Sequence, residues 1–321
     1  MTAPIVAGSK IDTIIPEAVR GEVIKNVTEV SAALTRGRRI PMTTRSEVQP
    51  VLATLPAVGW VSGEYGLKYI TDVSFEGVKL TAAELAAVLP IPDAVVDDAP
   101  VDLWGEVRPL LVEAIGAYLD RAVFFGGAKD VDFPQEWADN RQEGLVQAAV
   151  KTGNVVEETA GEDLGVTVAK AAQKLAQQGF AVNGYVCAPG LRWELAKARD
   201  KNGQPIFDQN ASALYGMPLS EALNGAWAAD ATMILGDFSK LLVGVRQDVT
   251  MQMFDTGVLS DAAGKVALNL LQQDSKALRS VFRAGYAVAN PVTRLQADKS
   301  KRFPFVVIKR PGAKLPGETT K

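Results

Sequence analysis

Carboxylates are the side chains of this sequence with the clearest capacity for chemistry. Asp93, Asp97, Asp98 and Asp102 gather in one short stretch, and carboxylate oxygens are the ligands that hard divalent cations prefer. The same residues lie just ahead of a predicted long helix, where negative charge complements the positive end of the helix dipole. We favour this second interpretation, and we predict no metal site and no cofactor site.

The 321-residue chain contains no histidine, which removes Ser-His-Asp and Cys-His nucleophiles and imidazole acid–base catalysis. The stretch 126–129 lacks the spacing of a phosphate-binding loop and is predicted to end a helix. Cys187 lies in the apolar run GYVCAP and is predicted to be a small core residue. We therefore predict no catalytic residue. An enzyme that uses carboxylate chemistry in the later α/β region is kept as an alternative, which a monomer with a ligand-dependent melting shift would support.

Charge and hydropathy narrow the possible partners. The 34 basic and 37 acidic residues give a net charge of -3, so no general basic field draws the chain to nucleic acid or to a membrane surface. Arg36, Arg38 and Arg39 could contact phosphate, but no aromatic residues are interleaved, and we favour a solvated or interface face. Neither a signal peptide nor an apolar run of bilayer length is present, which predicts a soluble, intracellular protein without membrane contact.

Aromatic residues are interpreted as packing elements. Trp60, Trp104 and Trp137 are predicted to anchor a core or an interface. In the run ILGDFSKLLVGVRQDV (234–249), Asp237 and Ser239 have turn-forming side chains, and Phe238 is predicted to fold back as an apolar plug. This turn is therefore predicted to be a corner between two strands and not a ligand site.

The first half of the chain is predicted to contain three extended elements. Residues 14–37 have apolar side chains at helical spacing and predict a short amphipathic helix in an N-terminal arm. Residues 51–80 alternate apolar and polar side chains, which predicts an irregular two-stranded ribbon that needs a partner surface. Residues 100–127 predict one long helix, with Pro109 a source of strain unless it lies in the opening turn.

The second half of the chain is predicted to be mixed α/β. Helices are predicted over 162–178 and 190–200, with an apolar strand at 185–189 between them and a loop over 201–225. Separate strands follow at 231–237, 240–247 and 249–255, another strand surrounds Asn269, and the last strand covers 302–309. Residues 311–321 are predicted to form a mobile tail.

Several motifs, taken in order, resemble those of tailed-phage major capsid proteins with the HK97 fold. At the C-terminal side these are the corner GDFS (236–239), the strand that carries Arg246, and DSKALRSVFRAGYAVANP (274–291). At the N-terminal side they are IIPEAVRGEVI (14–24), IPMTT (40–44) and AVGWVSGEYG (57–66). The stretches SFEGVKLTAAELAAVLPIPDAVVDD (74–98) and ALYGMPLSEA (213–222) resemble the family in between.

The resemblance implies an α+β, HK97-like capsid fold. Its parts would be an N-terminal arm (1–50), an extended β-ribbon loop (51–90), a peripheral domain with a long spine helix (91–160), an axial α/β domain (161–270), and a return to the peripheral domain with a C-terminal tail (271–321). The resemblance also implies assembly or structural roles for the following residues: Trp60, Glu64, Asp237, Phe238, Arg246, Arg279 and Arg283.

The implied function is that of a major capsid protein. Its copies would form hexamers and pentamers of an icosahedral shell around double-stranded DNA, bound without sequence specificity, with a portal and possible separate scaffolding or decoration proteins as further partners. The shell would be assembled in the host cytoplasm and belong to the virion. An encapsulin, which encloses an enzyme cargo in a shell of the same fold, is the alternative.

A covalent crosslink between subunits is a further implication of the resemblance. Some members of the family join neighbouring subunits by a lysine–asparagine isopeptide bond. Lys68 and Lys79 in the ribbon are candidate nucleophiles, Asn269 approximately matches the acceptor position, and Asp274 is the candidate carboxylate. Solvated lysines and an ordinary strand asparagine are the favoured interpretation, because lysines are usually exposed.

Overall fold

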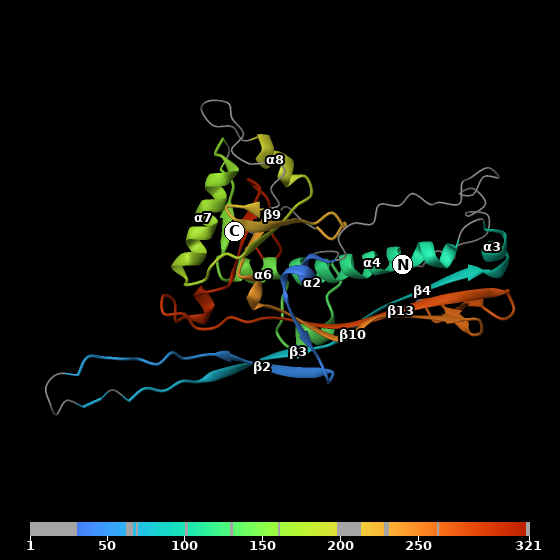
Figure 1. Cartoon of the computed structure of the whole chain (residues 1–321), viewed down its shortest axis with the longest axis horizontal. Coiled ribbons are helices and arrows are strands. Elements are labelled where there is room, and N and C mark those ends of the chain that lie inside the picture. Colours follow the sequence, from blue (N-terminus) through green and yellow to red (C-terminus); the bar gives the residue numbers. More distant parts are fainter. Residues whose placement is uncertain are drawn as a thin grey trace. The chain divides into compact units, whose positions relative to one another are not determined.

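The computed structural model describes residues 31–61, 67–68, 70–99, 102–128, 131–159, 161–197, 213–227, 231–261 and 263–318. Most of the predicted arm helix, Glu64 and the first part of the predicted loop 201–225 lie outside these residues. The described helices are α2 (Ala32–Arg36), α3 (Asp93–Asp98), α4 (Leu103–Phe125), α5 (Gln135–Asp139), α6 (Leu145–Lys151), α7 (Leu164–Gln177) and α8 (Leu191–Lys197) (Figure 1).

The strands of the described chain form a six-stranded, a four-stranded and two two-stranded sheets. They are β1 (Arg38–Pro41), β2 (Ser46–Leu52), β3 (Phe75–Thr81), β4 (Ala83–Pro92), β5 (Val155–Glu157), β6 (Gly184–Cys187), β7 (Ala213–Leu214), β8 (Met217–Glu221), β9 (Ala231–Gly236), β10 (Leu241–Phe254), β11 (Val258–Ser260), β12 (Val266–Asn269), β13 (Ser275–Val288) and β14 (Phe305–Lys309). Two short 3₁₀ turns are η1 (Phe238–Lys240) and η2 (Lys299–Lys301).

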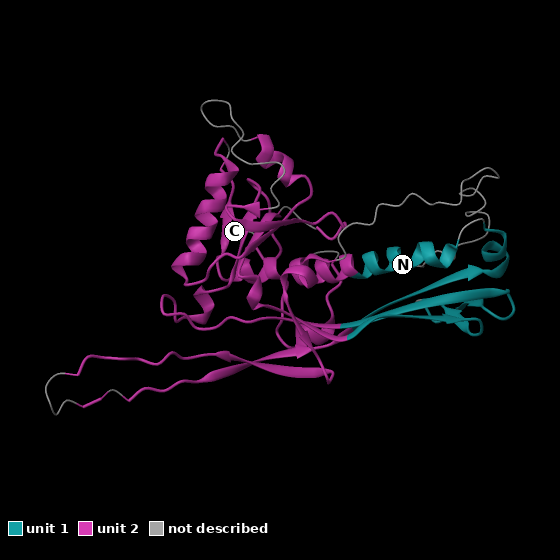
Figure 2. Ribbon diagram, in the orientation of Figure 1, with its two compact units in different colours: residues 1–30, 84–115, 247–283 teal, residues 31–83, 116–246, 284–321 magenta. Residues whose placement is uncertain are grey.

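The chain divides into two compact units, each assembled from separate stretches of sequence (Figure 2). Unit 1 comprises residues 1–30, 84–115 and 247–283, and unit 2 comprises residues 31–83, 116–246 and 284–321. The expected division into five consecutive segments stays a prediction.

A six-stranded sheet organises unit 2, in the order β5-β14-β9-β6-β8-β7. β14 and β9 run antiparallel, as do β9 and β6, whereas β6 and β8 run parallel. Every side chain of β6 is buried, and so is every side chain of β9, which is typical of strands covered on both faces. The predicted loop is wrong over 217–221, because these residues form β8 beside β6.

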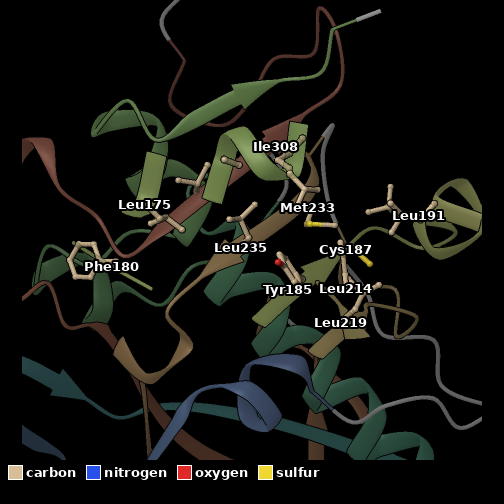
Figure 3. Packing of buried hydrophobic residues seen from close by; sticks show 14 residues of the cluster. Leu175, Phe180, Tyr185, Cys187, Leu191, Leu214, Leu219, Met233, Leu235 and Ile308 are labelled. Atoms are coloured by element: carbon tan, nitrogen blue, oxygen red, sulfur yellow. The ribbon is translucent and has the colours of Figure 1, made fainter. Parts of the chain in front are cut away.

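Helices α7 and α8 bury one face of this sheet (Figure 3). Alternate residues along the strands, such as Tyr185 and Cys187 on β6, enter the same cluster as Leu175 of α7 and Leu191 of α8. Cys187 is fully buried, as predicted, and burial raises the pKa of its thiol to about 12. The helix predicted over 162–178 is confirmed as α7, which begins two residues later, where Asp163 caps its first turn, and which is followed by Gly179 with a positive φ.

The turn at Asp237 is a structural corner, as predicted. The Asp237 Oδ1 atom accepts hydrogen bonds from the Ser239 backbone N–H (3.1 Å), the Ser239 hydroxyl (2.6 Å) and the Asn183 amide (2.8 Å). Phe238 is buried and meets Phe305 of β14 edge-on, with ring centroids 5.2 Å apart. The turn thereby joins the end of β9 to the start of β10 through side-chain hydrogen bonds and one aromatic plug.

The predicted long helix is confirmed as α4. Pro109 lies inside it and not in its opening turn, so the backbone carbonyl of Gly105 receives no helical hydrogen bond from that position. Gly127 follows the helix with φ +86°, a conformation that glycine adopts without strain and that explains the helix end predicted there.

Other boundaries differ from the predictions. Residues 240–247 and 249–255, predicted as two strands, belong to the single fourteen-residue strand β10 in the four-stranded sheet β1-β10-β13-β4. The predicted mobile tail is wrong over 311–318, because Leu315 is buried and the Lys309 ammonium contacts the Glu318 carboxylate at 2.9 Å.

Truncation of the plug tests the account of the corner. Phe238→Ala is expected to lower the free energy of unfolding by about 3 to 5 kcal/mol, as for other large-to-small core changes, in denaturant titrations of the subunit. Asp237→Asn is expected to cost less than about 1 kcal/mol, because asparagine keeps the Oδ1 acceptor. A larger loss for Asp237→Asn than for Phe238→Ala would contradict the plug and indicate a role for the carboxylate charge.

Candidate functional site

The ribbon of unit 2 is the candidate functional site, because it exposes apolar side chains without a covering layer. β2 and β3 pair antiparallel in the register Ser46↔Thr81 to Leu52↔Phe75. Beyond the strands, the two arms stay together through Ala53 N–H to Ser74 O (2.8 Å) and Ala57 N–H to the Thr71 hydroxyl (2.8 Å). The predicted ribbon is confirmed, although its regular pairing begins at Ser46 and not at residue 51.

Large apolar side chains of the ribbon lie in solvent. Trp60, Leu67 and Ile70 are 99%, 92% and 101% exposed, and the following ribbon residues are also exposed: Val48, Val58, Val61, Val73 and Phe75. Soluble monomers rarely expose apolar groups of this size together, and such groups mark surfaces that another molecule covers. The three tryptophans therefore differ: Trp104 and Trp137 are buried as predicted, whereas Trp60 lies outside the subunit core.

The base of the ribbon is anchored within unit 2. Val51 and Val78 pack on a buried cluster that includes Met42, Leu80 and Leu242. Each arm is also tied to the segment that precedes β14. Leu52 O accepts from Val292 N–H (3.0 Å), Pro56 O from the Arg294 guanidinium (3.2 Å), and the Glu76 carboxylate from the Lys299 ammonium (2.6 Å). The ribbon is thus fixed at one end, and most of its other described residues are exposed.

Arg246, Arg279 and Arg283 lie on strands β10 and β13, and the latter two have side-chain partners. In unit 1, the Arg279 guanidinium lies 4.9 Å from the Phe254 ring centroid and donates to Gln252, and Arg283 Nε donates to the Glu84 carboxylate at 2.7 Å. In unit 2, hydrogen bonds from Thr43, and then from Thr44, lower the pKa of Glu47. The charge of Arg246 adds to that lowering.

The candidate crosslinking residues belong to two different units. Lys68 and Lys79 are exposed residues of the ribbon in unit 2. Asn269 and Asp274 flank the turn between β12 and β13 in unit 1. The Asn269 carboxamide donates to the Gln272 side chain at 2.9 Å, and Asp274 has φ +40° with its carbonyl accepting from Asp93 N–H.

The acidic stretch is dispersed by the fold. The short helix α3 contains Asp93, Asp97 and Asp98. Only Asp102 directly precedes α4, so the predicted position at the start of the long helix is confirmed for one of the four residues. Asp93 pairs with Lys276 at 3.4 Å. Within the described residues, no group of three or more His, Cys, Asp or Glu side chains is placed to hold a metal ion, and no helix is long and apolar enough to cross a membrane.

Two polar contacts of unit 2 had no recognisable signal in the sequence. Arg36, predicted to face solvent or an interface, donates through Nε to the Ser220 hydroxyl of β8 at 2.8 Å. Asp120, a single acidic residue of α4, is fully buried. Both pair with residues about a hundred or more positions distant, so no local pattern indicates them.

Comparisons with known proteins agree with this architecture. The family model described as "Phage capsid family" matches residues 12–293. A protein named "Major capsid protein" from Staphylococcus phage 80alpha is 22% identical over 271 residues, which cover 84% of this chain and 79% of that protein.

Solved structures extend the likeness to the whole fold. A chain from Microbacterium phage Oxtober96 is 31% identical, with a TM-score of 0.79 and coverage of 95% of this chain and 99% of that one. A chain from Mycobacterium phage Cain is 31% identical, with a TM-score of 0.80 and coverage of 96% and 99%. The capsid of an empty GTA particle shares the fold at 14% identity, with a TM-score of 0.63 and coverage of 96% and 99%.

The chain belongs to the phage capsid family. The α+β fold expected from the resemblance is confirmed, and the function is that of a phage major capsid protein, which assembles into the capsid shell of a virion. The encapsulin alternative is not favoured. The matched relatives are structural proteins of the capsid.

Two tryptophan substitutions separate core from surface roles. Trp60→Ala is expected to change the free energy of unfolding of the subunit by less than about 0.5 kcal/mol, because the side chain is 99% exposed. Trp104→Ala removes a side chain that is 8% exposed and is expected to cost about 3 to 5 kcal/mol. Denaturant titration measures both changes, and equal losses would contradict the exposed position of Trp60.

Proposed function

We propose that the exposed ribbon is the element through which one copy of this chain holds the next in a shell of hexamers and pentamers with icosahedral symmetry. The observation that carries this proposal is the run of uncovered apolar side chains led by Trp60 and Ile70. A two-stranded ribbon buries too little to be stable alone in water, so a second copy of the chain is the surface that completes it.

The proposed contents of the shell are double-stranded DNA, bound without sequence specificity. The net charge of -3 supports this, since strong attraction to the phosphate backbone would hold packaged DNA on the shell wall. A portal, and separate scaffolding or decoration proteins where the phage has them, are the proposed further partners. Assembly is proposed to take place in the host cytoplasm, and no catalytic activity is proposed for the chain.

Structural roles are proposed for the residues that the sequence singled out. Asp237 and Phe238 set the corner of unit 2, and their contacts lie inside one subunit. Arg246, Arg279 and Arg283 lie on exposed strand positions, where long charged side chains can reach a neighbouring copy. Trp60 and Glu64 are proposed to take part in ribbon contacts, with Glu64 outside the described residues.

Replacement of the ribbon tip tests the proposed role of the ribbon. Residues 58–70 lie beyond the hydrogen bond between Ala57 and Thr71, so a short Gly-Ser turn in their place leaves the β2–β3 pairing intact. The variant is expected to keep the melting temperature of the subunit and to form no closed particles, as judged by sedimentation and electron microscopy.

A second variant separates the length of the ribbon from its apolar side chains. This variant keeps the length of residues 58–70 and replaces their apolar residues by Ser and Gly. It is also expected to form no closed particles. Closed particles of normal size from both variants would contradict the proposed ribbon contact. If wild-type particles contained an enzyme cargo and no DNA, this result would support the encapsulin alternative.

A covalent crosslink is a separate proposal about the same ribbon. The neutral side-chain amine of Lys68 or Lys79 would attack the Asn269 carboxamide of a neighbouring copy. An amide bond would form and ammonia would leave, while Asp274 takes up the proton from the lysine nitrogen. Particles boiled in detergent and run on a denaturing gel are expected to show a ladder of multimers. Asn269→Ala, and either Lys68→Ala or Lys79→Ala, should reduce the ladder to the monomer, and a lone monomer band from wild-type particles would contradict the proposal.

A further inference from the structure

Asp120 is a fully buried carboxylate in the second half of α4. Its Oδ1 atom accepts from the Ser31 hydroxyl (2.6 Å) and the Ala33 N–H (2.9 Å). Its Oδ2 atom accepts from the Ala32 N–H (2.7 Å) and the Asn224 amide (3.0 Å). Each oxygen therefore has two donors, and all four donors are neutral groups.

This carboxylate lies where buried charge is costly, so its hydrogen bonds must compensate for lost water. Burial raises the pKa of Asp120, and the hydrogen bonds from Ser31, Ala33, Ala32 and Asn224 partly offset that increase. Two charged side chains of neighbouring elements have other partners. Arg36 of α2 donates to Ser220, and Glu221 of β8 accepts from the Gly190 N–H.

Three of the four donors come from the first described residues of the chain, at the start of α2. Ser31 also caps α2 through its hydroxyl, which accepts from the Leu34 N–H. At the other end of α2, Arg36 donates to Ser220, and Gly37 packs so closely that a Cβ there would lie 2.6 Å from the Ala33 carbonyl. The start of α2 is therefore tied to Asp120 of α4, and its end is tied to Ser220 of β8.

We propose that Asp120 is the anchor that fixes the position and direction of the chain at residues 31–33, where α2 begins. One carboxylate accepts from the backbone of Ala32 and Ala33 and from the hydroxyl of Ser31, which sets the direction of the chain at residue 31. The fourth donor, Asn224, ties that point to the chain after β8. The consequence for assembly rests on the proposed function, because a second copy of the chain is the partner that a subunit with α2 held in this position would contact.

Hydrogen exchange of the purified chain tests the anchor without reference to assembly. In Asp120→Asn an amide N–H₂ replaces one oxygen and faces a donor, so protection of the amides of residues 32–37 is expected to fall at least tenfold relative to wild type. Protection in β6, β9 and β14 is expected to stay unchanged. Asp132→Asn is the matched control, because Asp132 is an exposed carboxylate with one hydrogen bond, from Tyr118, and it should alter neither region.

Asn224→Asp tests the anchor through the pH dependence of amide protection, which a contact without charge would not produce. It places a second carboxylate beside Asp120, and two adjacent carboxylates cannot both ionise without repulsion. Protection factors of residues 32–37 should match wild type near pH 5 and fall at least tenfold by about pH 8, where both groups are charged. Wild type, with a neutral amide at residue 224, should not lose protection in this way.

The outcomes separate the anchor from the proposed shell function. Loss of protection limited to residues 32–37, together with loss of closed particles in Asp120→Asn, supports both the anchor and its role in assembly. Wild-type protection at residues 32–37 in Asp120→Asn would overturn the anchor, whatever particles form. Lost protection with normal particles would overturn the role in assembly. If Asp120→Asn does not fold, Ser31→Ala decides, and unchanged protection in that variant would overturn the anchor.

Discussion

A two-stranded ribbon has no second layer, and this constraint governs the arrangement of unit 2. Past the contacts of Pro56 and Glu76, the described chain leaves the large apolar side chains of the ribbon uncovered, so Trp60, Leu67 and Ile70 remain in solvent. Pro50 lies within β2 and cannot donate to a further strand, which suits an edge strand that must not pair indiscriminately. The uncovered side chains therefore define a surface for a partner and not a defect in the fold.

The stability of unit 2 comes from elsewhere. Its six-stranded sheet is covered by α7 and α8 on one face, with Leu175, Tyr185 and Met233 among the fully buried residues. The ribbon adds little to that core and is connected to it by a small cluster around Leu80 and by the Glu76–Lys299 ion pair. This separation explains how a subunit can keep a folded core while it exposes apolar surface along one element.

Local chemistry decides which parts of the fold could be predicted from the sequence. The corner at Asp237 was predictable because the turn residue, its hydrogen-bond acceptor and the plug are neighbours in the chain. The C-terminal end of α7 was predictable for the same reason, since Gly179 lies within one turn of the helix end. β8 was missed because its strand character comes from pairing with β6, some thirty residues earlier, and not from its own Met-Pro-Leu-Ser-Glu pattern.

The candidate site was predictable only in part, because exposure is a property of the whole subunit. Nothing in the local pattern distinguishes Trp60 from Trp104, yet one lies in solvent and the other in the core of unit 1. Asp120 is the extreme case, since its role depends on partners 87 to 104 residues away. An apolar side chain at such a buried position is often no less stabilising than a charge. What a carboxylate adds is direction, because its two oxygens accept four donors in fixed positions and so set the course of the chain at the start of α2.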